Sequence, residues 1–207
     1  MSSHSHNHIQ EAFLQGSEVD FNYFAPDQAR FYKEHLLWIF YHTNGTIQAA
    51  FYRLTDKDIA NALIGAHQRG VRVEVVLDPG AINSKYSLAH QLFKAGITLY
   101  RYQPTGLLPP FPRTFPSIMH HKSIIFTDVI GGFSLVACGS LNFTNAGFNG
   151  NREQMQIRSR HTQDFLHHFQ LLKEASEQIS EQHFIRPSKI MKKIKNLVGL
   201  RRFLHKL

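Results

Sequence analysis

Two histidines and a lysine interrupt a run of strand-forming apolar residues in IMHHKSIIF, residues 118–126. Alternate side chains of a strand share a face, so His120 and Lys122 are predicted to point the same way, roughly 7 Å apart. An imidazole that can attack phosphorus, beside a fixed cation that neutralises phosphate oxygens, suits phosphodiester chemistry. His121 faces the other way and is predicted to pack in the core or against a helix.

Further polar side chains follow in GSLNFT (139–144) and NRE (151–153). The hydroxyl of Ser140 and the amide of Asn142 can hold phosphate oxygens without adding charge. The carboxylate of Glu153 can orient an imidazole through its second nitrogen. An exposed strand end, turns and helix caps would explain each residue alone, and 14 histidines in 207 residues make a chance His-x-Lys triplet easy to find. The joint order of these residues is what points to a site.

Strands alternate with helices ahead of the histidine segment, which predicts β-α-β units. Thr55 or Asp56 is expected to cap the first helix, and Gly70 to end it. The expected elements are strand 46–52, helix 55–70, strand 71–78 ending in a Pro-Gly turn, helix 84–95 and strand 97–102. The fold class is therefore α/β, with a mostly parallel or mixed central sheet and helices on both faces. Ligands of such sheets bind beyond the carboxyl ends of the strands.

The other segments complete this domain. Residues 29–43 have helical apolar spacing, although their aromatic side chains leave a strand open. After the histidine strand, a turn at Gly131 and Gly132 leads to its hairpin partner. The remaining expectations are strand 133–140, a loop or short helix at 141–151, strand 153–159 and an amphipathic helix at 162–180. Residues 103–117 contain five prolines and form a long loop, which either overhangs the site or packs on itself or on a partner subunit.

The charge divides the chain unevenly. The formal net charge is +8, and residues 186–207 hold eight basic residues and no acidic one. Attraction to nucleic acid or to an anionic membrane is therefore concentrated in this tail. The polar, His-rich N-terminus is expected to be a floppy segment, although its alternating histidines could bind a divalent metal. The predicted parts are a disordered N-terminus (1–20), a catalytic domain (21–185) and a basic amphipathic tail (186–207).

Composition also limits the location of the protein. No window approaches 18 uncharged apolar residues, so no spanning helix is expected. The N-terminus lacks a basic segment followed by an apolar one, so no secretory signal is expected. The single cysteine, Cys138, cannot form an internal disulfide and is expected to be a small core residue. These features favour a cytoplasmic protein, with peripheral membrane binding as an option.

Together, MHHKSIIF and GSLNFTNAGFNGNREQMQI resemble the phospholipase D superfamily in its compact branch with one His-x-Lys motif per chain. That branch includes small bacterial nucleases and the mitochondrial cardiolipin hydrolase. The likeness covers roughly residues 20–180, because the first β-α-β segment also resembles the family. The motif matches at His120, Lys122, Gly139, Ser140, Asn142, Asn151 and Glu153. The resemblance implies a phospholipase D-like fold in which Asn151 supports the site.

The sequence departs from the family pattern at one position. The family aspartate should fall at Thr127, and Asp128 follows one residue later. Either a strand bulge restores the role of Asp128, or that role is lost. The resemblance implies that this aspartate supports structure rather than taking part in the chemistry.

The resemblance also implies a mechanism. One motif per chain implies a homodimer with a shared site, in which His120 of one subunit attacks phosphorus and His120 of the other acts as acid and then base. Lys122, Ser140 and Asn142 would hold the phosphate oxygens and Glu153 would orient the histidine, with no metal or other cofactor.

The substrate stays open at this stage. An endonuclease on DNA or RNA would use the basic tail and the loop aromatics to bind backbone and bases. A phospholipase or cardiolipin hydrolase would use an amphipathic helix at 188–207 on an anionic membrane. That helix could equally dock on the dimer. A non-catalytic module that binds nucleic acid or lipid is the third reading, supported by Thr127 alone.

Overall fold

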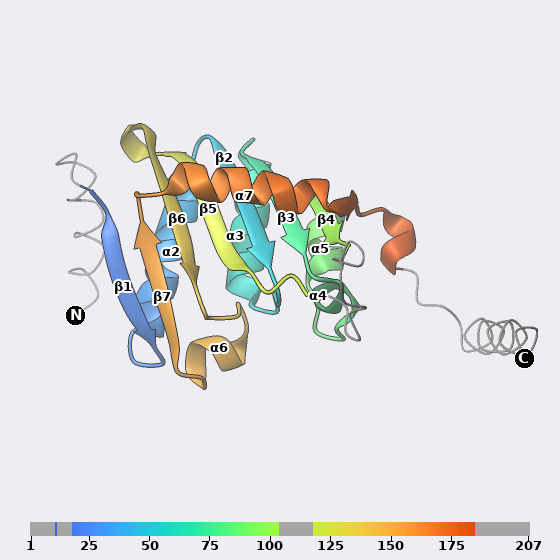
Figure 1. Ribbon diagram of the computed structural model, residues 1–207, viewed down its shortest axis with the longest axis horizontal. Helices are drawn as coiled ribbons and strands as arrows, with labels where there is room; N and C mark the ends of the chain where they lie inside the picture. The colour runs from blue at the N-terminus through green and yellow to red at the C-terminus, as the bar shows by residue number, and fades with distance from the viewer. Residues whose placement is uncertain (1–10, 12–17, 104–117, 185–207) are drawn as a thin grey trace, which may run out of the picture.

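An eight-stranded mixed sheet forms the centre of the molecule, in the order β1-β7-β6-β5-β2-β3-β4-β8 (Figure 1). The computed structural model describes residues 11, 18–103 and 118–184. Strands β2, β3 and β4 are parallel, and every other neighbouring pair is antiparallel. The strands are β1 (Asp20–Ala25), β2 (Thr46–Phe51), β3 (Arg72–Leu77), β4 (Thr98–Tyr102), β5 (Lys122–Val129), β6 (Phe133–Gly139), β7 (Glu153–Arg158) and β8 (Ser176–Gln178).

Helices cover both faces of this sheet, which confirms the predicted fold class. Three of them, α2, α3 and α5, pack on one face, and α7 crosses the other face diagonally (Figure 1). No described helix is long and apolar enough to span a bilayer. The helices are α2 (Ala29–His42), α3 (Lys57–Gln68), α4 (Pro79–Asn83), α5 (Ala89–Lys94), α6 (Asn145–Asn149) and α7 (Thr162–Glu174), with 3-10 turns at Ile130–Gly132 and Glu181–Phe184.

Each face of the sheet has its own apolar cluster, because successive strand side chains point to opposite faces. The larger cluster lies under α2 and α3 and includes Leu36, Leu63 and Ile124. The smaller one lies under α7 and includes Val76 and Phe169. Up to Phe126, the alternation predicted for β5 therefore assigns its even-numbered residues to the first face and its odd-numbered residues to the α7 face.

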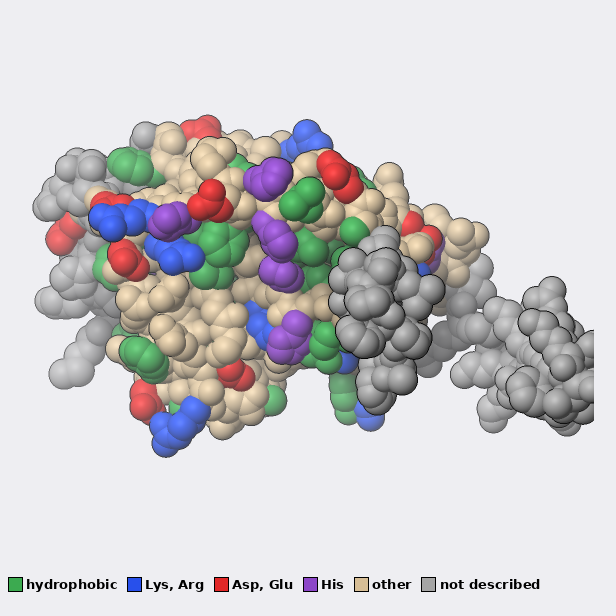
Figure 2. Space-filling model, in the orientation of Figure 1, with side chains coloured by type: hydrophobic (Ala, Val, Ile, Leu, Met, Phe, Trp, Pro, Cys, Tyr) green, Lys and Arg blue, Asp and Glu red, His purple; other side chains and the backbone are tan. Residues whose placement is uncertain are grey.

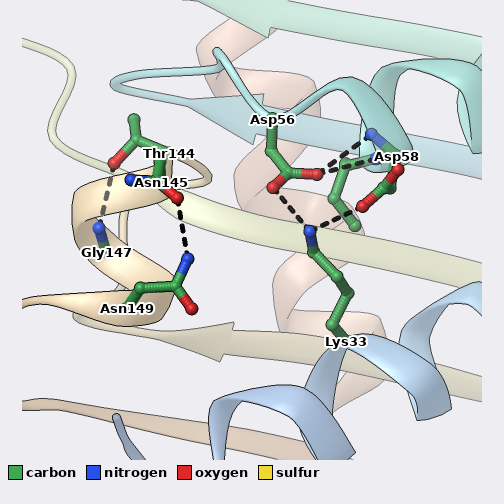
Figure 3. Close-up of polar contacts among 8 residues, drawn as sticks. Lys33, Asp56, Asp58, Thr144, Asn145, Gly147 and Asn149 are labelled. Atoms are coloured by element: carbon green, nitrogen blue, oxygen red, sulfur yellow. Dashed lines mark hydrogen bonds and ion pairs between the residues drawn. The ribbon is translucent and has the colours of Figure 1, made fainter.

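The turn between β2 and α3 is fixed by a polar cluster (Figure 3). Asp56 caps α3, as one of the two predicted candidates, and accepts the amides of Asp58 and Ile59 at 3.1 and 3.2 Å. Lys33 of α2 binds the carboxylates of Asp56 and Asp58 at 2.7 and 2.8 Å. The cluster ties α2 to α3 and so fixes the chain that leaves the end of β2.

Two predicted helices differ from the observed ones. The helix expected at 84–95 is shorter than predicted, because only Ala89–Lys94 is helical, as α5. The Pro-Gly expected as a turn instead forms the first turn of a separate helix, α4, since Asp78 caps it and proline is well suited to that position. The helix expected at 162–180 ends at Glu174. Ser176 then donates to the carbonyl of Leu172 at 2.6 Å, and the chain turns to pair as β8 with the edge of β4.

Several predictions fall mainly outside the described residues. They concern the His-rich N-terminus, all but the first residue of the proline-rich loop, and the basic tail. The histidine strand itself begins at Lys122 rather than at residue 118, so the residues before it form an extended approach to β5.

Candidate active site

The predicted site residues lie along one edge of the sheet, at the carboxyl ends of the parallel strands. β5 runs antiparallel to β2, so Lys122 pairs with Phe51, the last residue of β2. The register of β6 and β7 places Ser140, just after β6, and Glu153, the first residue of β7, at the same edge. This is the edge at which open α/β sheets bind ligands.

The backbone that carries His120 is fixed on both sides. The amide of Met119 donates to the carboxylate of Asp78 at 3.2 Å. The carbonyl of His121 accepts the amide of Tyr52 at 2.8 Å. These bonds come from the residues that follow β3 and β2, so the position of His120 is set by the central strands rather than by a free loop.

The ring of Tyr52 lies among three nitrogenous side chains. Its centroid is 4.4 Å from that of the exposed His120 ring, 5.1 Å from Nζ of Lys122 and 4.1 Å from the guanidinium carbon of Arg53. Nζ of Lys122 also donates to the carbonyl of His120 at 2.7 Å. One aromatic ring therefore contacts the imidazole and both cations at this edge of the sheet.

Lys122 is held as a buried cation, with 6% of its surface exposed. Burial lowers the pKa of Lys122 below the ordinary lysine value, the carboxylate of Glu153 opposes that shift, and Arg53 adds to it. A concentrated positive charge with few water molecules around it is well suited to holding phosphate oxygens.

Glu153 is hydrogen-bonded to neighbouring side chains of the same chain. Its carboxylate accepts the Ser140 hydroxyl at 2.5 Å and the side-chain amide of Asn151 at 3.1 Å. Within the described residues, neither Glu153 nor any other side chain is hydrogen-bonded to the ring of His120. The role of Glu153 in orienting that histidine therefore stays a prediction, whereas Asn151 directly supports Glu153.

Asn142 lies in a tightly held turn between β6 and α6. Its side-chain oxygen is buried and has no hydrogen-bond partner among the described residues. The next carbonyl, of Phe143, accepts the amides of Thr55 and Asp56 at 2.9 and 3.0 Å, which ties the turn to the start of α3. Thr144 caps α6 through the amide of Gly147 at 3.1 Å (Figure 3). A buried amide oxygen without a partner is uncommon in a core.

Replacing Gly147 by alanine is expected to disturb this turn. A Cβ at this position would lie 2.1 Å from the carbonyl oxygen of Asn142. We expect a loss of about 1–3 kcal/mol in the free energy of unfolding and up to about 100-fold in phosphodiester hydrolysis from displacement of Asn142. Gly65→Ala in α3 is the control, because the nearest atom to its Cβ is 3.8 Å away. Equal effects of the two substitutions in melting and activity assays would contradict the prediction.

The family aspartate position is occupied by Thr127, and β5 has a bulge between Phe126 and Val129. The hydroxyl of Thr127 accepts the amide of Thr46 at 2.8 Å and lies 2.9 Å from the Thr46 hydroxyl. Asp128 has a left-handed backbone with φ of 51° and an exposed side chain. The bulge thus leaves the side chain of Thr127, not that of Asp128, bonded to the start of β2.

This arrangement predicts opposite outcomes for two adjacent substitutions. Thr127→Ala removes the hydrogen bonds to Thr46 and is expected to lower the free energy of unfolding by about 1–2 kcal/mol. Asp128→Asn retains the left-handed backbone and is expected to change it by less than about 0.5 kcal/mol. Denaturant melts of both variants measure the difference, and a larger loss for Asp128→Asn would assign the support to the carboxylate instead.

A pocket of about 510 Å3 opens on the α7 side of His120. Among the described residues that line it, none is acidic. Figure 2 shows a column of histidine side chains crossing this face. His121 contacts His168 of α7 there, which agrees with its predicted helix-facing side, and Cys138 is half-buried in the lining rather than in the core. The apolar wall of the pocket is formed by Tyr102, Ile118, Met119, Phe165 and Leu172.

Three residues of the site were missing from the sequence-based set. Tyr52 and Arg53 directly follow β2, and Asp78 directly follows β3. Polar or aromatic residues at the carboxyl ends of parallel strands were the available signal. The part of the chain that the structure describes contains no cluster of three or more His, Cys, Asp or Glu side chains arranged to hold a metal ion.

Residues 39–174 match a family model described as "Cardiolipin synthase, PLD-like domain". The chain belongs to this phospholipase D-like family. It is 34% identical over 106 residues to a phospholipase D of Rickettsia felis, and 30% identical over 112 residues to the mitochondrial cardiolipin hydrolase of Xenopus laevis. These matches cover 51% and 54% of this chain and 45% and 46% of the two relatives. The chain therefore spans about half the length of the curated relatives it matches.

Two solved structures of this phospholipase D-like fold match over their whole length. NucT from Helicobacter pylori has a TM-score of 0.70 at 19% identity and covers 79% of this chain. Nuc from Salmonella typhimurium, a phospholipase D family member, has a TM-score of 0.64 at 26% identity and covers 80% of this chain. In each case all of the solved chain is covered.

Proposed function

We propose that this phospholipase D-like protein is a metal-independent phosphodiesterase, and that its substrate is DNA or RNA. The observation that carries the proposal is the pairing of an exposed His120 with a buried Lys122 across one tyrosine ring, at the edge that also holds Ser140 and Glu153. A solvent-exposed nucleophile beside a buried cation is well suited to attack on a bound phosphate.

The reaction proceeds in two steps at a site shared by two subunits. His120 of one subunit attacks phosphorus, a histidine–phosphorus bond forms, and the bond from phosphorus to the leaving oxygen breaks. His120 of the second subunit gives its proton to that oxygen. The same imidazole then takes a proton from water, whose oxygen displaces the first histidine and completes hydrolysis. Two copies of Lys122 supply positive charge to the non-bridging oxygens.

The remaining side chains orient these groups. Asn142 donates to the phosphate oxygens, and Ser140 does so by turning its hydroxyl proton away from Glu153, to which it donates in the unbound chain. Glu153 orients a histidine across the subunit boundary. The ring of His120 is exposed and has no hydrogen-bond partner among the described residues, which supports an arrangement that a second subunit completes. Tyr102 and Phe165 in the adjoining pocket offer faces on which bases stack.

A phospholipase is the second candidate, and two observations favour it. The pocket beside His120 has an apolar wall, and relatives with 30–34% identity are named phospholipase D and mitochondrial cardiolipin hydrolase. An acyl-bearing glycerol group would lie against this wall, and the basic tail would bind the anionic surface.

The test compares wild type with His120→Ala in EDTA, on single-stranded DNA, RNA, duplex DNA and cardiolipin-containing vesicles. Cleavage of nucleic acid alone, lost in the variant, would support the nuclease. Release of phosphatidic acid alone would establish the phospholipase instead. If no substrate is hydrolysed, including bis-p-nitrophenyl phosphate, the chain would be a non-catalytic binding module. Activity that EDTA removes and divalent ions restore would overturn the metal-independent mechanism.

A further inference from the structure

The imidazoles of His121 and His168 lie next to each other in the lining of the pocket. Their Nε2 atoms are 3.2 Å apart, and their ring centroids are 4.8 Å apart. His121 is fixed by the backbone bond of its carbonyl to Tyr52. His168 lies on α7, which is anchored by the buried Phe169 next to it and by the ion pair of Lys173 with Glu74 at 2.6 Å. Both rings are therefore presented by rigid elements.

The separation of the two nitrogens limits what can lie between them. Two ring N–H groups cannot point at each other across 3.2 Å, so at most one proton is shared. A tetrahedral metal ion with bonds of about 2.0–2.1 Å to two imidazoles holds their nitrogens about 3.3 Å apart. The observed separation is therefore close to that between two imidazole ligands of one tetrahedral ion.

Neutral imidazole is the form that binds metals. The charge of Lys122 in the lining opposes any bound cation, and the described lining contains no carboxylate. Hard ions such as Mg2+ and Ca2+, which require oxygen ligands, are therefore disfavoured, whereas Zn2+ and similar ions prefer imidazole.

We propose that His121 and His168 bind a divalent transition-metal ion of the Zn2+ class, and that this ion inhibits the enzyme. The two imidazoles supply two ligands, and the open pocket leaves the remaining positions to water. The ion would join the approach to β5 to helix α7 next to His120, and its charge and bound waters would occupy the pocket through which substrate reaches that histidine. The inhibitory part rests on the proposed function, whereas the binding part does not.

The test measures Zn2+ binding by titration calorimetry and thermal melting, on full-length chains in which His4, His6 and His8 are replaced by serine. Three proteins are compared on that background: the otherwise unchanged chain, His168→Ala, and the control His167→Ala, which removes the exposed neighbour on α7. We expect His168→Ala to lose one bound ion and the rise in melting temperature that Zn2+ gives the other two. His168→Gln repeats the comparison if the alanine variant melts early without metal.

Each outcome decides one part of the proposal. The same number of bound Zn2+ ions per chain in all three proteins, or the loss of one ion in both variants, would overturn the His121–His168 site. If the site is present, Zn2+ should inhibit hydrolysis in the unchanged chain and in His167→Ala but not in His168→Ala. Binding without this difference in inhibition would overturn the inhibitory part alone. If no substrate is hydrolysed at all, the proposed function fails while calorimetry still decides the binding site.

Discussion

Substituting alanine for His120 is expected to lower kcat/KM for phosphodiester hydrolysis by at least about 10⁴-fold, because this one side chain acts as nucleophile in one subunit and as acid and base in the other. The ring of His120 is exposed and contacts only Tyr52 among the described aromatic rings. Its removal should therefore leave the melting temperature nearly unchanged. Initial rates and thermal melts on the same preparation measure both effects.

His167→Ala is the matched control for this substitution. His167 is also an exposed histidine on the α7 side of the chain, but it does not line the pocket. We expect the His167→Ala protein to hydrolyse phosphodiesters at the wild-type rate. A His120→Ala protein that keeps more than about one hundredth of wild-type activity while folding normally would remove His120 from the role of nucleophile.

The same variant tests whether the site is shared. If each active site needs His120 from both subunits, mixed dimers are inactive. After joint unfolding and refolding of equal amounts of wild type and His120→Ala, about one quarter of the activity should survive, rather than the half expected from independent sites. A linear dependence on the fraction of wild-type subunits would show that each subunit carries a complete site.

The local pattern of the sequence predicted which face of the sheet each side chain occupies better than it predicted the lengths of the helices and strands. Alternation along β5 placed Lys122 and Ile124 on one face and His121 on the α7 side, because strand geometry has a period of two and no other information is required. The predicted end of α7, at residue 180, was wrong because the apolar pattern continues after Glu174. There, the open edge of β4 offered backbone hydrogen bonds that no periodicity within the segment encodes.

The site was predictable only where its residues are close in sequence. His120 with Lys122, and Ser140 with Asn142, could be paired by spacing. The contribution of Tyr52 depends on the antiparallel register between β2 and β5, and that of Asp78 on a bond to an amide 41 residues away. The exchange of Thr127 for the expected aspartate was visible in the sequence, but its consequence was not, since it depends on the bond to Thr46 across the sheet.

Lys122→Met is expected to separate activity from stability. Loss of the buried charge should lower kcat/KM by about 10²–10³-fold, since that charge holds the phosphate oxygens as the reaction proceeds. Methionine retains most of the buried side-chain length against Tyr52 and carries no charge into the protein. We therefore expect the melting temperature at neutral pH to stay the same or rise.

The pH dependence of the melting temperature provides a second test of this prediction. The pKa of Lys122 is lowered in the folded protein, mainly by burial. The unfolded chain therefore binds the lysine proton more tightly, and keeping Lys122 protonated lowers the stability of the folded state at neutral pH. As pH rises from the folded pKa toward the ordinary lysine value, the folded state loses this proton first and wild type gains stability. The advantage of Lys122→Met in melting temperature should thus be greatest near neutrality and shrink in alkaline buffer, where wild-type activity should fall as well.

Lys85→Met supplies the control, because Lys85 is exposed and its pairing with the Tyr86 ring lies outside the pocket. It should show neither the loss of activity nor the pH-dependent difference. If Lys122→Met instead melted below wild type at every pH, the buried ammonium would be a net stabilising group, and its hydrogen bond to the carbonyl of His120 would outweigh its burial. Lys122 would then be kept for the fold as well as for the phosphate. If the variant is more stable and far less active, the protein retains a buried cation at a cost to its own stability, which only a role in binding or catalysis explains.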